Sequence, residues 1–453
     1  MLDSTINQIM RRQNLSGAHR RLGRAQNLIA FLIGCLTLGM LAACTGPAEP
    51  ASTPASVSSS ASPQSQQSLK MLWYGNAAEE TLLRQQLLDS QLNVELTVVP
   101  ADQLEDTLDY LITTDRAPDV VRTASPASHW AELKAIDQIT VEDFLVGLDW
   151  SMMRGKEVVS VPYSTHTSLV VVNADLFEAA GIALPTSDFP WKSWDRMLVD
   201  AAQAAQQPWQ PPIPASQPLV ALDQASPLAL DAYLWQRGLS YYDEKRGGSA
   251  WDIELGTKTL ADLTQAIEQR ALASTFELDA TTTPAKPKTS ARALFESASV
   301  PLLLTDSSYQ PATNFKTIWL PDPCQEQCGP MPGADFLVNF GAHPQADQLI
   351  NYLTSPSAQI QRAEIGALPT RRQVLNEMQQ WPVDRLGPAA RVAVRELELT
   401  HPAALATGFS PARPLADQKT TNALAGLVAG TSTPQRASEV IGRGSVTALS
   451  QSR

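Results

Sequence analysis

The chain has 453 residues and a formal net charge of −12, with 46 acidic and 34 basic side chains. An acidic surface repels nucleic acid and anionic lipid, so this balance excludes a nucleic-acid partner and a polybasic membrane patch. The length is sufficient for two lobes with separate hydrophobic cores.

The N-terminal region has the organisation of a secretory signal. Five arginines between positions 11 and 24 precede residues 28–43, which carry no charged side chain. This order predicts a signal peptide over residues 1–43, with Met10 as an alternative start to Met1. The apolar run is shorter than the roughly 20 residues of a spanning helix, which disfavours an uncleaved anchor.

Leu41-Ala42-Ala43-Cys44 resembles the lipobox of bacterial lipoproteins. The resemblance implies that Cys44 is acylated, becomes the first mature residue and attaches the protein to a lipid bilayer outside the cytoplasm. Residues 44–68 are rich in Ser, Pro and Ala, and their composition predicts a disordered tether.

The globular part begins with a β-α-β-α-β pattern. Residues 69–74, 94–99 and 118–121 are predicted strands, and residues 79–91 and 101–114 are predicted helices. This order favours a parallel sheet flanked by helices, whose ligands lie at the carboxyl ends of the strands. Several polar or aromatic side chains follow the first and third strands: Trp73, Tyr74, Asn76, Arg122, Thr123 and Ser125.

Further strands are predicted over residues 158–163, 169–173 and 300–305, with residues 164–167 as a loop between the first two. Residues 208–218 form a predicted Pro-rich surface loop. The predicted helices of this half cover residues 174–181, a segment after 190, 228–238, 255–272, 291–296, 345–353 and 357–365, and the remainder is mostly helical.

Several stretches together resemble the extracellular solute-binding proteins of ABC importers, the group that includes maltose-binding protein. Their order and spacing match over about residues 69–380, and Gly366-Ala367-Leu368-Pro369-Thr370-Arg371 is one example. The others are residues 156–163, 171–177, 179–182 with Pro185 and Trp194-Asp195, 293–297, 302–307, 346–353 and 355–359. The chain departs from the family pattern at His166, where Asp or Asn is common, and in the Pro-rich insert.

The resemblance implies an α/β fold of two lobes, each a mainly parallel sheet flanked by helices. Three hinge crossings are expected, near residues 172–173, 302–303 and 333–334. Lobe 1 would comprise residues 69–172 plus 303–333, and lobe 2 residues 173–302 plus 334–453. A monomer of this kind closes around its solute and delivers it to the membrane subunits of an ABC permease, without a cofactor.

A carbohydrate ligand needs aromatic planes for its apolar faces and polar groups for its hydroxyls. Because side chains alternate along a strand, one of Trp73 and Tyr74 is expected in the cleft and the other in the core. For Trp235, packing of a helix face is the alternative role, and Tyr242 is the alternative to Tyr241. The expected ligand-binding residues are Trp73, Tyr74, Asn76, Ser125, Tyr163, Ser164, His166, Trp235, Tyr241, Asp306, Ser307, Tyr309 and Asp335.

Cys324 and Cys328 are close in sequence, and outside the cytoplasm such a pair is expected to form a disulfide. A zinc site would need two more ligands, and His343 is the only nearby imidazole, so no metal is expected.

Two other functions compete with transport. A lipoprotein of the same fold could act as a sensor or scaffold. A secreted glycoside hydrolase would need two carboxylates about 5 to 9.5 Å apart. The sequence contains no Gly-x-Ser-x-Gly, His-Glu-x-x-His or P-loop motif, and we expect a binding protein rather than an enzyme.

Overall fold

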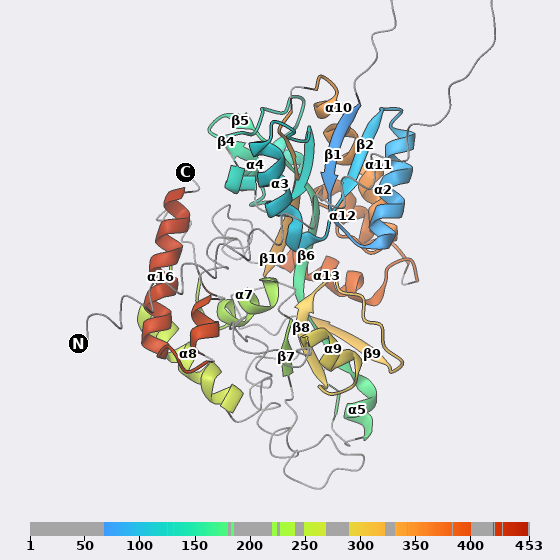
Figure 1. Ribbon diagram of the computed structural model, residues 1–453. Helices are drawn as coiled ribbons and strands as arrows, with labels where there is room; N and C mark the ends of the chain where they lie inside the picture. The colour runs from blue at the N-terminus through green and yellow to red at the C-terminus, as the bar shows by residue number, and fades with distance from the viewer. Residues whose placement is uncertain are drawn as a thin grey trace, which may run out of the picture. The chain divides into compact units, whose positions relative to one another are not determined.

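The computed structural model describes residues 68–124, 126–129, 131–179, 183–184, 220–223, 227–240, 249–268, 290–321, 331–341, 343–382, 384–399, 420, 422–427 and 429–451 (Figure 1). The expected signal peptide and nearly all of the tether, with Cys44, lie outside these residues. So do the predicted helix after residue 190, the Pro-rich loop, and the site or disulfide candidates Ser125, Tyr241, Tyr242, Cys324 and Cys328.

The strands are β1 (Leu69–Trp73), β2 (Val94–Val98), β3 (Val120–Thr123), β4 (Met153–Arg154), β5 (Glu157–Val158), β6 (Ser160–Asn173), β7 (Val220–Leu222), β8 (Leu302–Asp306), β9 (Thr317–Pro321) and β10 (Pro332–Asn339). The α-helices are α2 (Ala77–Asp89), α3 (Leu104–Thr113), α4 (Asp149–Met152), α5 (Ala174–Ala179), α7 (Pro227–Trp235), α8 (Ile253–Glu268), α9 (Ala291–Glu296), α10 (Ala346–Leu353), α11 (Pro356–Glu364), α12 (Arg372–Met378), α13 (Pro388–Leu399) and α16 (Pro434–Gln451). Among the described helices, none is both long enough and apolar enough to span a bilayer.

The first sheet has the strand order β2-β1-β3-β10-β6. β1 pairs in parallel with β2 and β3, which confirms the predicted β-α-β-α-β pattern, and β10 is antiparallel to β3 and β6. Helix α2 begins with a capping box, in which the Asn76 side chain accepts from the amide of Glu79 and the Glu79 carboxylate accepts from the amide of Asn76. The turn after β1 is therefore fixed on both sides.

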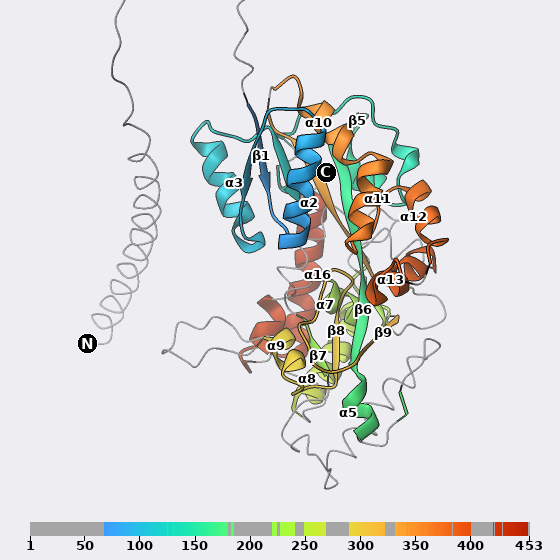
Figure 2. The same ribbon diagram turned by 90° about the vertical axis from the view of Figure 1, so that its right-hand side faces the viewer.

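Strand β6 links the two sheets (Figure 2). Its first half pairs with β10, and from Ser168 onward it pairs with β8 and β9. The prediction of a loop at residues 164–167 is wrong, because these residues form ladder pairs with β10, such as Ser164 with Asp335. The change of partner falls between Thr167 and Ser168, not near residue 172.

The second sheet contains β7, β8, β9 and the end of β6; among these described strands the β7–β8 pair is parallel and the pairs of β6 with β8 and β9 are antiparallel. Both sheets are thus mixed, whereas mainly parallel sheets were expected. Helices α8 and α16 pack together, and α13 contacts β6 and β9. Large hydrophobic clusters lie on this sheet, including one around Phe295, Leu303 and Val374.

The strand pairing also differs from the expected lobe boundaries. β8 and β9 lie in the second sheet. Apart from Leu302, their residues were expected in lobe 1, as part of residues 303–333. β10 lies wholly in the first sheet, and α10 and α11 pack on the first-sheet side. After α11, Leu368 forms an isolated bridge with Thr165, and Arg371 forms one with Phe144. From there the chain passes back towards the second sheet.

Candidate functional site

A pocket of about 560 Å³ lies where β6 passes from one sheet to the other. It is lined by Tyr74, Gly75, Asn76, Glu79, Ala101, Leu104, Glu105, Arg122, Ala124, Ser164, Thr165, His166, Arg292, Asp306, Ser307, Ser308, Gln310, Asp335 and residues 365–368. Seven of the expected site residues are brought together here: Tyr74, Asn76, Ser164, His166, Asp306, Ser307 and Asp335.

Neighbouring strands of the first sheet place one wall of the pocket. Tyr74 directly follows β1, Arg122 is in β3, Asp335 is in β10 and Ser164 is in β6. These strands are consecutive in the sheet order, so residues far apart in sequence become neighbours. Asp306 ends β8 and contributes from the second sheet.

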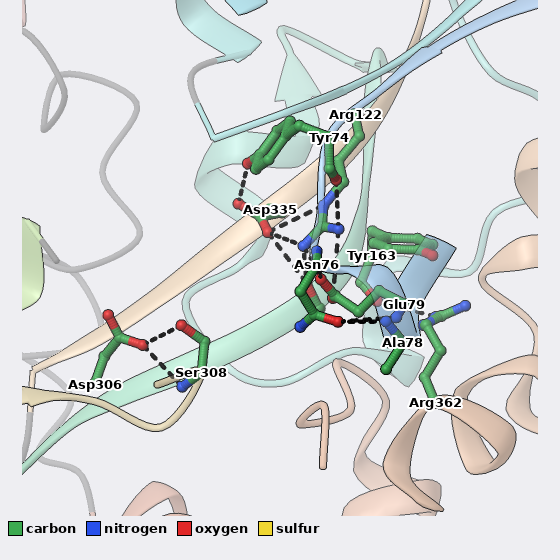
Figure 3. Close-up of polar contacts among 11 residues, drawn as sticks. Tyr74, Asn76, Ala78, Glu79, Arg122, Tyr163, Asp306, Ser308, Asp335 and Arg362 are labelled. Atoms are coloured by element: carbon green, nitrogen blue, oxygen red, sulfur yellow. Dashed lines mark hydrogen bonds and ion pairs between the residues drawn. The ribbon is translucent and has the colours of Figure 1, made fainter. Parts of the chain in front are cut away.

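Arg122 is the centre of a buried polar cluster on this wall (Figure 3). Its Nη2 donates to Asp335 Oδ2 at 2.6 Å, and its Nη1 donates to the carbonyl of Tyr74 at 2.8 Å. Glu79 Oε1 lies 3.4 Å from the same guanidinium. The Tyr74 hydroxyl donates to Asp335 Oδ1 at 2.6 Å, so both carboxylate oxygens are used. Arg122 and Asp335 are only 5% and 6% exposed.

Aromatic rings surround the same guanidinium. Its central carbon lies 4.7 to 5.2 Å from the ring centroids of Tyr74, Tyr163 and Trp73. Arg362 lies 4.0 Å from the Tyr163 centroid. These cation–π contacts are strongest where water is excluded, so the rings hold the cluster in place.

The pKa values in this cluster follow from burial and charge. Burial alone would raise the pKa of the Asp335 carboxyl, but Arg122, His166 and the hydrogen bond from Tyr74 hold that pKa below 3.8. Burial, followed by the Asp335 charge, raises the pKa of the Tyr74 phenol well above 10.0. At neutral pH the cluster therefore contains an ionised carboxylate and a protonated phenol that donates to it.

The second wall contains Asp306, Ser307 and Arg292. Asp306 Oδ1 accepts from the Ser308 amide at 2.8 Å and from the Ser308 hydroxyl. The Ser307 hydroxyl accepts from the amide of Thr167 at 3.2 Å, which fixes this turn to β6. Arg292 Nε donates to Asp223 Oδ2 at 2.7 Å.

Four expected site residues do not line the pocket. Trp73 is fully buried in the first core, so of the alternating pair it is Tyr74 that faces the pocket. Tyr163 also packs in that core. Tyr309 packs in the second core and donates to Glu296 at 2.9 Å. Trp235 packs against Leu228, Ala232 and Met331, in agreement with its alternative role.

The structure adds lining residues that were not among the expected site residues, notably Glu79, Arg122, Arg292 and Gln310. Arg122 had a usable signal, because it follows the third predicted strand at the expected ligand edge. Glu79 lies in the first turn of α2, and its sequence position indicates only the start of a helix. Its contact with Arg122 depends on the tertiary fold.

The family model for bacterial extracellular solute-binding proteins matches residues 88–360, more than half of the chain. The chain belongs to this family. Membership confirms the predicted resemblance and indicates a solute-binding protein that acts outside the cytoplasm. No curated protein matches the sequence closely enough to count as a relative.

Solved structures of similar fold confirm the two-lobed α/β architecture. The GacH receptor of Streptomyces glaucescens, solved unliganded and with acarbose, matches with a TM-score of 0.64 and 17% identity over 85% of this chain and 99% of that one. A Thermotoga lettingae ABC transporter solute-binding protein bound to α-D-tagatose gives 0.64 and 17% over 84% and 99%. The cyclic α-maltosyl-1,6-maltose binding protein of Arthrobacter globiformis gives 0.63 and 17% over 84% and 98%. At these identities the likeness shows the fold alone.

The lowered pKa of Asp335 predicts a loss of stability in acid. A carboxyl whose pKa is lower in the folded state stabilises the protein above its unfolded pKa, and this stabilisation disappears as the pH falls through the folded value. The free energy of unfolding of the wild type should therefore decrease from about pH 5 to about pH 3, because the reference pKa is 3.8.

The measurement is urea denaturation of the full chain and of Asp335→Asn across this range. The stability difference between the two proteins should be constant from about pH 7 to about pH 5 and shrink below that. A difference that stays constant down to about pH 3 would contradict the charge on Asp335.

Proposed function

We propose that the pocket binds a small polar solute, a carbohydrate, and that the protein delivers this solute to an ABC permease as a monomer. The observation that carries the proposal is the pocket at the junction of the two sheets, with polar groups from both. Family membership supports solute binding, and the similar structures include an acarbose complex, a tagatose complex and a binding protein for a cyclic maltosyl sugar. Closure of the two lobes would enclose the solute.

The geometry supports binding without chemical conversion. A glycoside hydrolase needs one carboxylic acid with a raised pKa as its proton donor. Asp335 has the opposite shift, because burial is outweighed by the charges of Arg122 and His166 and by donated hydrogen bonds. Glu79 is also held against Arg122. These two of the four lining carboxylates are structural groups of the wall, and the family consists of solute-binding proteins, so we infer that the protein is not an enzyme.

For the N-terminal region we propose acylation of Cys44 after removal of residues 1–43, with residues 44–68 as the tether. The protein would then work outside the cytoplasm on a membrane surface. Cys44→Ser should move the protein from the membrane fraction to the soluble fraction or leave an unprocessed precursor. Mass spectrometry of the mature N-terminus measures the lipid directly, and an unmodified Cys44 would contradict this proposal.

A thermal-shift screen of the full chain tests carbohydrate binding. The panel should contain mono- and oligosaccharides, polyols and sugar phosphates. A ligand at 100 times its dissociation constant should add about 2.7 kcal/mol to the free energy of unfolding. If no sugar or polyol shifts the melting temperature or gives heat in calorimetry, the carbohydrate proposal fails.

His166→Ala should weaken the best ligand of that screen by about tenfold or more, which corresponds to about 1.4 kcal/mol. His166 lines the pocket from β6 and is only partly buried, so its removal should leave the fold intact. His343→Ala is the matched control, since His343 lies outside the pocket lining and accepts a hydrogen bond from the amide of Gln345. If the two variants bind the ligand equally well, the ligand does not contact His166 on β6.

A further inference from the structure

The charges around the pocket are unequal. Among the described lining residues there are four carboxylates, Glu79, Glu105, Asp306 and Asp335, against two arginines, Arg122 and Arg292, and one histidine, His166. A ligand that enters the pocket interacts with these charged groups at short range, where little water screens the interaction. The lining groups that are not already in an ion pair within the protein then determine which ligand charge the pocket favours.

Both arginines are committed to carboxylates of the protein. Arg122 lies 2.6 Å from Asp335 and 3.4 Å from Glu79, so this cluster is saturated and carries no positive excess. Arg292 lies 2.7 Å from Asp223, which is buried and does not line the pocket. Neither guanidinium therefore offers an uncompensated positive charge to an anionic ligand.

Asp306 is in the opposite situation. It is 4% exposed, yet no Lys, Arg or His nitrogen of the described residues lies within 4.0 Å of its carboxylate. Ser308 donates twice to Oδ1, and Oδ2 accepts no hydrogen bond from any described residue. A buried carboxylate without a cation is costly unless another donor satisfies it. Figure 3 shows Asp306 across from the Arg122 cluster, at the end of β8.

We infer that the pocket selects a saccharide that carries an ammonium group, an amino sugar, and places this group against Asp306. A charge-assisted hydrogen bond from the ammonium to Oδ2 would supply the cation and the donor that the described residues do not provide. A uronic acid or a sugar phosphate would bring a further negative charge into the pocket, where both arginines of the described lining already face carboxylates of the protein. The assignment rests on the proposed carbohydrate binding and adds the charge of the ligand to it.

Isothermal titration calorimetry of the full chain tests the inference with three forms of the same glucose disaccharide: neutral, 2-amino-2-deoxy and uronate. We expect the amino form to bind about tenfold or more tighter than the neutral form, as one charge-assisted hydrogen bond allows. The uronate form should bind more weakly than the neutral form. This comparison uses the wild-type chain and does not depend on any variant folding.

Asp306→Asn then locates the preference. Asparagine keeps an acceptor for Ser308 and removes the charge, so the affinity ratio of the amino to the neutral form should fall to about one. Asp262→Asn makes the same change on the exposed surface of α8 and should keep the wild-type ratio. An unchanged ratio in Asp306→Asn would overturn the role of Asp306.

The failures of the two proposals are distinguishable. If the neutral form binds and the amino form has no advantage, or if the uronate form binds best, the charge selectivity is wrong and carbohydrate binding stands. If none of the three forms binds, and the wider sugar screen also gives no ligand, carbohydrate binding itself fails, and the assignment of an amino sugar fails with it.

Discussion

Arg122→Met should lower the free energy of unfolding by about 3–5 kcal/mol, the largest effect that we expect from a single change in the pocket wall. Methionine fills much of the same space but leaves Asp335 buried, ionised and without its cation. The Tyr74 carbonyl also loses the donor at 2.8 Å. Urea denaturation of the full chain at neutral pH measures the loss.

The matched control is Arg84→Met on α2. Arg84 lies 2.7 Å from Glu80, but its side chain is 55% exposed, so this ion pair should contribute less than about 1 kcal/mol. The double variant Arg122→Met/Asp335→Asn should recover part of the stability, because it no longer buries a charge. If Arg122→Met is as mild as Arg84→Met, the cluster does not depend on its ion pair.

Much of the first sheet was predictable from local sequence. Residues 69–121 alternate strand and helix with clear hydrophobic periodicity, and the limits of the strands and α-helices lie within three residues of the predicted ones. The capping box at Asn76 is a local signal of the same kind. Such signals suffice when the elements that pair are also neighbours in sequence.

The pairing of distant strands was harder to predict. β7, β9 and β10 were not predicted, although the family resemblance implied a crossing near residues 333–334. β7 follows the Pro-rich insert, and β9 is a short strand with a Pro at its end. β10 and residues 164–167 stabilise each other as strands through their ladder. A partner about 170 residues away gives no local signal.

The site was predicted by position along the chain better than by orientation. Tyr74 and Asp306 line the pocket from the ends of β1 and β8, whereas Ser164 and Asp335 line it from within β6 and β10. Tyr163 precedes Ser164 in β6 at a register shift with β10, and its ring packs in the first core beside the Arg122 guanidinium. Side chains do not alternate strictly across this shift, so the position of Tyr163 depends on the pairing of β6 with β10.

Trp73→Ala should cost about 3–5 kcal/mol in the free energy of unfolding, because the whole indole is removed from a packed core. The ring is 0% exposed, and it fills the space above Gly75 so closely that a Cβ there would lie 2.1 Å from Cη2. Collapse of the surroundings into the cavity would also move the turn that carries Tyr74 and Asn76. The measurement is again urea denaturation of the full chain.

Tyr74→Phe is the informative comparison, since it changes the adjacent residue on the other face of the strand. It keeps the ring and deletes only the donor to Asp335 Oδ1, so it should cost about 1–3 kcal/mol. Ligand affinity separates the two positions further. Relative to its loss of unfolding free energy, Tyr74→Phe should lose more ligand affinity than Trp73→Ala, because Tyr74 lines the pocket and Trp73 does not. If Trp73→Ala folds with near wild-type stability but loses its ligand, the assignment of Trp73 to the core and Tyr74 to the pocket is wrong. The indole would then form part of the first wall of the pocket.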